Sequence, residues 1–162
     1  MLIAKVYVET TIPSYLAARP SLQTVVFTHQ QLTELWWKRR RQCFHLLVSE
    51  LVLQECSAGD AEIAERRMKL LEGIPVLAPN RAILELARTL VDRGPISRKA
   101  AGDAIHVATA TVYGCEYLLT WNCRHIANAE IRRAARRLVL AAGYELPVIC
   151  TPEELMGGTA DD

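Results

Sequence analysis

The chain has 162 residues, of which 51% are hydrophobic and 23% are charged. This length and composition predict one soluble globular domain with a sizeable core. The formal net charge of +1 excludes a whole-molecule field that would draw the protein onto nucleic acid or membrane, so any electrostatic binding must come from local patches.

Short apolar segments alternate with helix-like segments along the whole chain. Strands are predicted at 3–8, 43–48, 74–78, 116–121 and 147–150, and helices at 22–40, 50–56, 60–72, 80–93, 98–113 and 124–142. This alternation predicts an α/β fold: a mainly parallel sheet of about five strands with helices on both faces, the first and fourth strands adjacent. We expect a single domain over residues 1–156 and a flexible tail over 157–162.

The first predicted strand ends in a carboxylate, Glu9, within "KVYVETTIPSYL" (5–16). Asn122 follows the fourth predicted strand. In open α/β sheets, ligands gather beyond the carboxyl ends of the strands, so these two side chains mark a candidate site. An isolated buried carboxylate is unfavourable, so we expect Glu9 to meet an arginine, backbone donors or a metal ion.

The segment "VSELVLQECSAGD" (48–60) contains two further acids. Ser49 is the expected N-cap of a short helix, and the helix dipole accounts for Glu50 in the first turn. Glu55 lies near the end of this helix, where the dipole disfavours an anion. Glu55 is therefore either an ordinary surface side chain or part of a site.

Asp103 is the single carboxylate in the apolar helical segment "AAGDAIHVATATVYGC" (100–115), for which Ser97 is the expected N-cap. Val107 and Ala110 share its stripe of the helix at i+4 and i+7. A charge in such surroundings calls for a cation, which is either a metal ion or an arginine in a buried ion pair.

Basic residues gather in "WWKRRRQ" (36–42) and "EIRRAARRL" (130–138). We interpret the distant arginines of the second segment as a solvated helix face. Arg124 and His125 follow Asn122 closely and are candidates for contact with a phosphate backbone.

The five cysteines form no C-x-x-C pair and no cluster with histidine, so we interpret them as reduced and mostly buried. They are Cys43, Cys56, Cys115, Cys123 and Cys150. The N-terminal residues lack the pattern of a signal peptide, and no apolar run reaches the ~18 residues of a membrane span. We therefore expect a cytoplasmic protein.

Three stretches resemble the PIN domain family, of the kind found in VapC-type toxins, and the resemblance covers essentially the whole chain. They are "VYVETTIPSYL", "VSELVLQECSAGD" and "DAIHVATATVYGCEYLLTWNCRHIANAE". The resemblance implies that Glu9, Glu55 and Asp103 are catalytic and metal-binding acids, with Asn122 at the place of a fourth ligand. Thr10, Arg124 and His125 are the candidates for contact with nucleic acid.

The resemblance further implies a metal-dependent endoribonuclease, the toxin of a type II toxin–antitoxin pair. Its expected cofactor is Mg²⁺ or Mn²⁺, which hard carboxylate oxygens suit. RNA would be the substrate, a small antitoxin the partner, and the chain would form a homodimer. This chain has Glu9 where the family usually has Asp, and the neutral Asn122 where many members have a fourth acid. These differences leave open a second hypothesis, a PIN-fold module that binds RNA or protein without cleaving it.

If the three acids converge on one site, their carboxylates should repel one another. Two carboxylates ~4 Å apart repel by roughly 4 kcal/mol at an effective dielectric of about 20. We therefore expect at least one acid of the metal-free site to be partly protonated.

Overall fold

The computed structural model describes residues 2–157 and confirms the predicted α/β fold. One parallel sheet has the strand order β3-β2-β1-β4-β5. The strands are β1 (Lys5–Val8), β2 (His45–Ser49), β3 (Val76–Leu77), β4 (Tyr117–Leu119) and β5 (Val148–Cys150). The first and fourth strands are adjacent, as predicted, with Val8 opposite Leu119.

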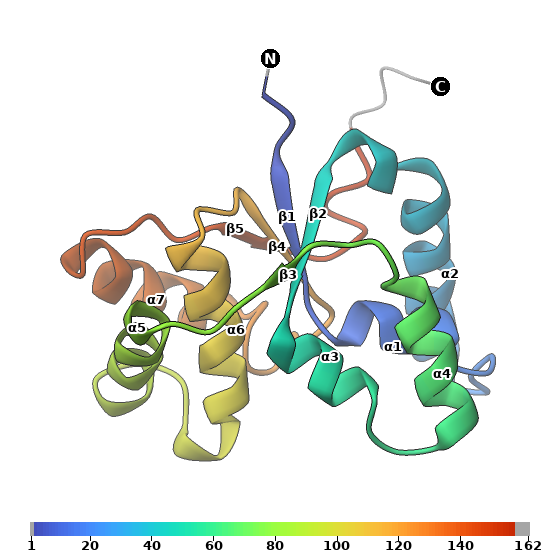
Figure 1. Cartoon of the computed structure of the whole chain (residues 1–162), viewed down its shortest axis with the longest axis horizontal. Helices are drawn as coiled ribbons and strands as arrows, with labels where there is room; N and C mark the ends of the chain where they lie inside the picture. Colours follow the sequence, from blue (N-terminus) through green and yellow to red (C-terminus); the bar gives the residue numbers. More distant parts are fainter. Residues whose placement is uncertain (1, 158–162) are drawn as a thin grey trace.

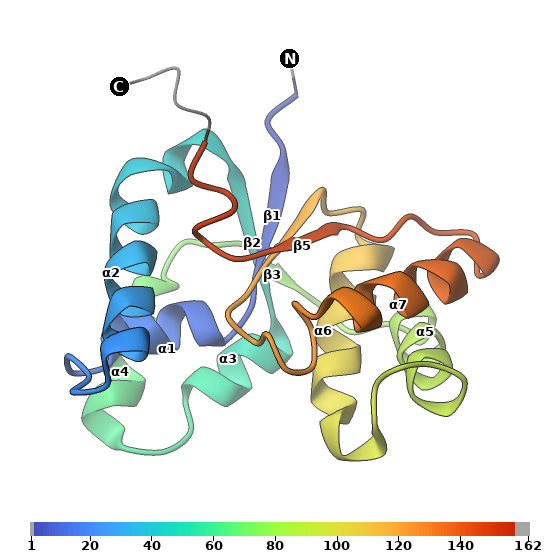
Figure 2. The same cartoon turned by 180° about the vertical axis from the view of Figure 1, so that it is seen from behind.

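Helices cover both sides of this sheet. They are α1 (Thr11–Ala17), α2 (Thr24–Arg39), α3 (Glu50–Cys56), α4 (Ala61–Leu70), α5 (Arg81–Asp92), α6 (Ala101–Val112) and α7 (Ala129–Ala141). Short 3₁₀ turns occur at η1 (Arg41–Cys43) and η2 (Arg98–Ala100). Figures 1 and 2 show α1 to α4 on one side of the sheet and α5 to α7 on the other.

The central strand β1 is the apolar centre of the molecule. Val6, Tyr7 and Val8 are all fully buried, which is typical of a parallel strand covered on both faces. On the α1 to α4 side, Trp36 is also fully buried, and its indole Nε1 donates to the carbonyl of Leu155 at 3.0 Å. This bond ties α2 to the C-terminal segment.

The predicted helix at 98–113 is wrong at its start, with a consequence for the site. The segment begins as the 3₁₀ turn η2, and the side chain of Ser97 makes no capping hydrogen bond. The α-helix α6 begins only at Ala101, so Asp103 lies in its first turn and not in its interior. A helix N-terminus favours a negative charge, so part of the apparent misfit of Asp103 disappears.

Two other elements differ from the prediction. Helix α1 was not predicted. Its first turn contains Pro13, which a helix tolerates there because backbone N–H groups of the first turn have no intrahelical partner, so the missing N–H of proline costs no hydrogen bond. Helix α7 begins at Ala129 instead of residue 124, because the side chain of Asn128 accepts from the N–H groups of Glu130 and Ile131. The residues between Asn122 and α7 form turns.

The cysteine prediction is confirmed in its main point. All five cysteines are free; Cys56, Cys115 and Cys150 are buried, whereas Cys43 and Cys123 are exposed. Within the described part of the chain, no helix combines the length and the apolar character that crossing a membrane requires. The predicted tail lies outside the described residues from position 158 onward.

Candidate functional site

Glu9 is buried directly after β1, with 3% of its surface exposed. Its Oε2 accepts hydrogen bonds from the N–H and the hydroxyl of Thr11 and from the hydroxyl of Thr120, the last at 2.8 Å. Its Oε1 makes no hydrogen bond within residues 2–157. The carboxylate of Glu9 therefore meets backbone and hydroxyl donors and no arginine in the described chain, and one of its two oxygens has no hydrogen-bond partner there.

The threonines around Glu9 join the ends of β1 and β4. The hydroxyl of Thr11 also accepts from the N–H of Trp121 at 2.9 Å, and the hydroxyl of Thr120 accepts from the N–H of Asn122 at 2.9 Å. Each hydroxyl therefore donates to Glu9 and accepts from the chain that follows β4. This exchange holds the carboxylate in one position.

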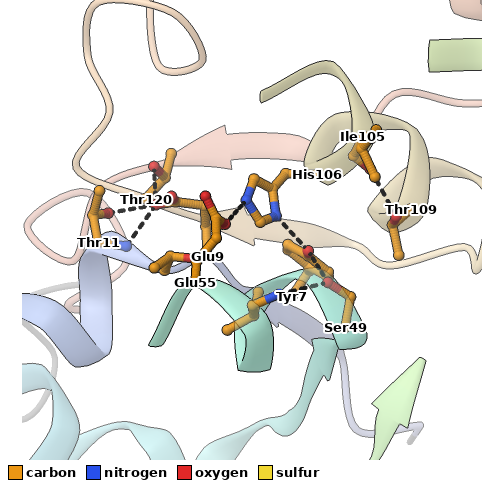
Figure 3. Close-up of polar contacts among 11 residues, drawn as sticks. Tyr7, Glu9, Thr11, Ser49, Glu55, Ile105, His106, Thr109 and Thr120 are labelled. Atoms are coloured by element: carbon orange, nitrogen blue, oxygen red, sulfur yellow. Dashed lines mark hydrogen bonds and ion pairs between the residues drawn. The ribbon is translucent and has the colours of Figure 1, made fainter. Parts of the chain in front are cut away.

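Glu55 is anchored although 41% of its side chain is exposed. Its Oε1 accepts from the hydroxyl of Thr10 at 2.8 Å and lies 2.6 Å from Nε2 of His106, which is 1% exposed. Thr10 is the chain neighbour of Glu9, so these contacts bring Glu55 to the end of β1 (Figure 3). Glu55 is therefore an exposed side chain, as one of the two interpretations expected, but it is held by two side-chain contacts and does not extend freely into solvent.

A buried row of polar side chains continues from His106. Its Nδ1 lies 2.7 Å from the hydroxyl of Tyr7, which lies 2.8 Å from Oγ of Ser49. Ser49 also caps α3, as predicted, by accepting from the N–H of Val52 at 3.2 Å. We did not predict that Tyr7 and His106 belong to the site; the available signals were a tyrosine inside an apolar strand and a histidine three residues after Asp103.

The electrostatic surroundings of Glu55 favour its ionised form. Burial raises the pKa of this carboxyl, but the hydrogen bond and the attraction of His106, together with the hydrogen bond from Thr10, outweigh burial and leave the pKa below its ordinary value. The expectation of a partly protonated acid is therefore wrong for Glu55.

This lowered pKa has a consequence for acid stability. A carboxyl with a folded-state pKa below its ordinary 4.5 stabilises the fold above that pH, and the contribution disappears as the pH falls through the folded-state pKa. We expect Glu55→Gln to lower the free energy of unfolding at neutral pH, by an amount that shrinks below pH 4.5. Urea denaturation of parent and variant over a series of pH values measures this; a deficit that stays constant in acid would contradict it.

Asp103 and Asn122 have different surroundings. Asp103 is half-buried and makes no hydrogen bond or ion pair within residues 2–157, so the alternative of a buried pair with arginine is not seen there. The side-chain Oδ1 of Asn122 accepts from the N–H of His125 at 3.0 Å. Asn122 thus caps the turn after β4, and its carbonyl is partly occupied by this local role.

The predicted ligand set fits a divalent ion by its donor chemistry. Among the residues that the structure describes, no three His, Cys, Asp or Glu side chains form a group that could hold a metal ion. However, Mg²⁺ keeps several waters and is usually bound through only one or two protein carboxylates. Oε1 of Glu9, Oε2 of Glu55 and both oxygens of Asp103 are free of hydrogen bonds in the described chain, and such hard oxygens suit this ion.

The basic candidates lie around the same end of the sheet and along α7. Arg124 is exposed and His125 half-buried in the turns after Asn122. The hydroxyl of Thr10 is used by Glu55. The arginines of α7 line a groove of ≈ 780 Å³ against β5 together with apolar residues, and all but one are exposed; they are Arg132, Arg133, Arg136 and Arg137.

A parallel sheet with acids at the carboxyl ends of β1 and α3 defines an α/β protein with a candidate site at that edge of the sheet. The family can be stated as well: the chain belongs to the PIN domain family, whose model matches residues 28–131. This confirms the resemblance given by the sequence. Glu55, Asp103 and Asn122 lie inside the matched segment, and Glu9 lies before it.

Two solved structures share the fold. VapBC2 from Rickettsia felis, bound to a DNA fragment from its promoter, superposes with a TM-score of 0.52 at 14% identity, over 91% of this chain and 98% of that one. VapC20 from Mycobacterium tuberculosis, a sarcin–ricin loop cleaving toxin, superposes with a TM-score of 0.52 at 15% identity, over 70% of this chain and 86% of that one. No curated protein sequence matches this chain significantly. At these identities the likeness supports the fold.

Proposed function

We propose that this protein is a metal-dependent endoribonuclease and the toxin of a type II toxin–antitoxin pair. The main support is the arrangement of two acids in a chain of the PIN domain family. The buried Glu9 and the ionised Glu55 lie at one edge of the sheet, and each has one carboxylate oxygen without a hydrogen bond in the described chain. Structural likeness to VapBC2 and VapC20 supports the toxin assignment. We place this activity in the cytoplasm, which the five free cysteines favour.

In this proposal, Mg²⁺ or Mn²⁺ is held by Glu9, Glu55 and Asp103, with Asn122 at the rim. Held there, the ion would supply a water of lowered pKa and would stabilise charge on the phosphate. Glu9 is fixed by its three donors and Glu55 by its two. Asp103 makes no competing bond in the described chain and is the carboxylate best able to orient or deprotonate the attacking water.

The substrate is RNA. Arg124 and His125, which follow Asn122, contact the phosphate backbone and set its register without reading sequence. Thr10 lies at the same edge of the sheet, and its hydroxyl donates to Glu55 and so helps to fix that carboxylate beside the RNA.

Metal binding provides the first test of this proposal. At about a hundred times its dissociation constant, Mn²⁺ should stabilise the fold by ~2.7 kcal/mol, which raises the melting temperature of a domain of this size by about 5–10 °C. Thermal melts with Mn²⁺ and with a chelator measure the shift, and RNA cleavage under both conditions measures the activity. A protein that binds RNA but is indifferent to metal in both assays would favour the second hypothesis, a PIN-fold module without catalysis.

The partner of the proposed toxin is a small antitoxin, and the chain forms a homodimer. Large apolar side chains are exposed at and before the start of α2, namely Leu22, Val25 and Phe27. Exposed apolar side chains that lie together mark a surface for another protein. The VapBC2 structure supports this part of the proposal, and co-purification of a small protein encoded beside this one tests it.

A further inference from the structure

Four side chains join both ends of α3 to β1 and α6 in one row, of which only the Glu55 end is exposed (Figure 3). Ser49 precedes α3 and Glu55 is near its end, while Tyr7 comes from β1 and His106 from α6. Along the row, the polar atoms are 2.8, 2.7 and 2.6 Å apart. Tyr7 is fully buried and His106 is 1% exposed, so the middle of the row is shielded from bulk water.

The two ends of the row determine the direction of its hydrogen bonds. The ionised carboxylate of Glu55 can only accept, so Nε2 of His106 must donate to it. In a neutral imidazole the other nitrogen is then an acceptor, and Tyr7 must donate to it. The oxygen of Tyr7 is then free to accept from the hydroxyl of Ser49.

We infer that His106 is a positioning residue for the Glu55 carboxylate, held by Tyr7 in the tautomer that carries its proton on Nε2. The inference rests on the proposed function, in which Glu55 binds the metal. A glutamate side chain loses conformational freedom when it is ordered. The bonds from His106 and Thr10 order it in advance through Oε1, and Oε2 stays free for a ligand.

Two replacements of His106 separate this role from a purely structural one. In His106→Gln the amide nitrogen can take the place of Nε2 and still donate to Glu55, but the bond with Tyr7 is lost. In His106→Asn the shorter amide can reach Tyr7 but not Glu55. Each variant keeps one of the two hydrogen bonds, so both should lose similar stability in urea denaturation.

Titration with Mn²⁺ alone, followed by the electron paramagnetic resonance of the free ion, should then distinguish the pair. We expect His106→Asn to bind Mn²⁺ about 10–100-fold more weakly than the parent, as is typical for loss of a group that orients a ligand. His106→Gln should retain most of the affinity. Equal losses in the two variants, or losses that follow stability, would overturn the inference.

The tautomer itself is measured by nitrogen–proton correlation spectra of the His106 imidazole in the metal-free protein. We expect the Nε2-protonated form in the parent, because Glu55 can only accept from this nitrogen, whereas an Nδ1-protonated parent would overturn the inference. A parent that binds no Mn²⁺ would overturn the proposed function instead. The tautomer would still decide whether Tyr7 and His106 hold Glu55, so the two failures are distinguishable.

Discussion

Asp103→Asn is expected to lower Mn²⁺-dependent RNA cleavage by at least about 100-fold, the lower end of the contribution of a positioned acid or base. The same change should leave the free energy of unfolding of the metal-free protein within ~1 kcal/mol of the parent. Asp103 makes no ion pair or hydrogen bond within residues 2–157, so neutralising it breaks no contact there. The remaining loss is its attraction to the N-terminus of α6, worth ~0.3–1 kcal/mol.

Asp92→Asn is the matched control for this prediction. Asp92 is the last residue of α5, is half-exposed and lies 3.7 Å from Arg98, an exposed pair of little energetic value. This variant should cleave RNA at the rate of the parent. Cleavage rates with Mn²⁺ and urea denaturation with chelator complete the comparison.

Two outcomes for Asp103→Asn would contradict the proposal. A loss of ~3–5 kcal/mol in the metal-free protein is what breaking a buried ion pair costs, and it would give Asp103 a structural role. A stable variant with unchanged cleavage would remove Asp103 from the catalytic site. Each result is separable from general misfolding because stability and activity are measured on the same samples.

Much of the fold follows from local pattern. The bounds of α3 match the predicted helix at 50–56 because Ser49 is a strong N-cap and its hydroxyl accepts from the N–H of Val52. The start of α6 was mispredicted because a serine before a helical segment has the same appearance whether it caps an α-helix or precedes a 3₁₀ turn. The structure places η2 between Ser97 and α6, and local sequence contains no signal that distinguishes these two cases.

The positions of the candidate acids follow from sequence pattern, whereas the contacts that hold them do not. Glu9 and Asn122 follow apolar strands, and parallel strands bring such positions to one edge of a sheet. The support depends on pairings between residues far apart in the chain: His106 lies 51 positions from Glu55 and 99 from Tyr7. A buried histidine in an apolar helix has the same sequence signature as a packed core residue, so only the fold shows which carboxylate it meets.

Glu9→Ala is expected to destabilise the protein by ~3–5 kcal/mol. The side chain is 3% exposed and its Oε2 accepts from three donors on two threonines. Removing it leaves buried donors without an acceptor, at a cost of ~1–3 kcal/mol for each that finds no other partner. Glu116→Ala is the control, because this exposed glutamate, just before β4, also accepts a backbone N–H, that of Lys5 at 2.7 Å. Its removal should cost no more than ~1 kcal/mol.

Glu9→Gln separates the structural part of this side chain from its charge. The amide keeps an acceptor oxygen of the same shape for Thr11 and Thr120, so we expect a loss of only ~1–2 kcal/mol, the difference between hydrogen bonds to charged and to neutral acceptors. Cleavage should nevertheless fall as far as in Asp103→Asn, because a neutral amide is a poor ligand for Mg²⁺ or Mn²⁺ in place of a carboxylate. If Glu9→Gln cleaved RNA at the parental rate, Glu9 would be a buried acceptor that joins β1 to β4, and the metal would have to be held by Glu55 and Asp103 without it.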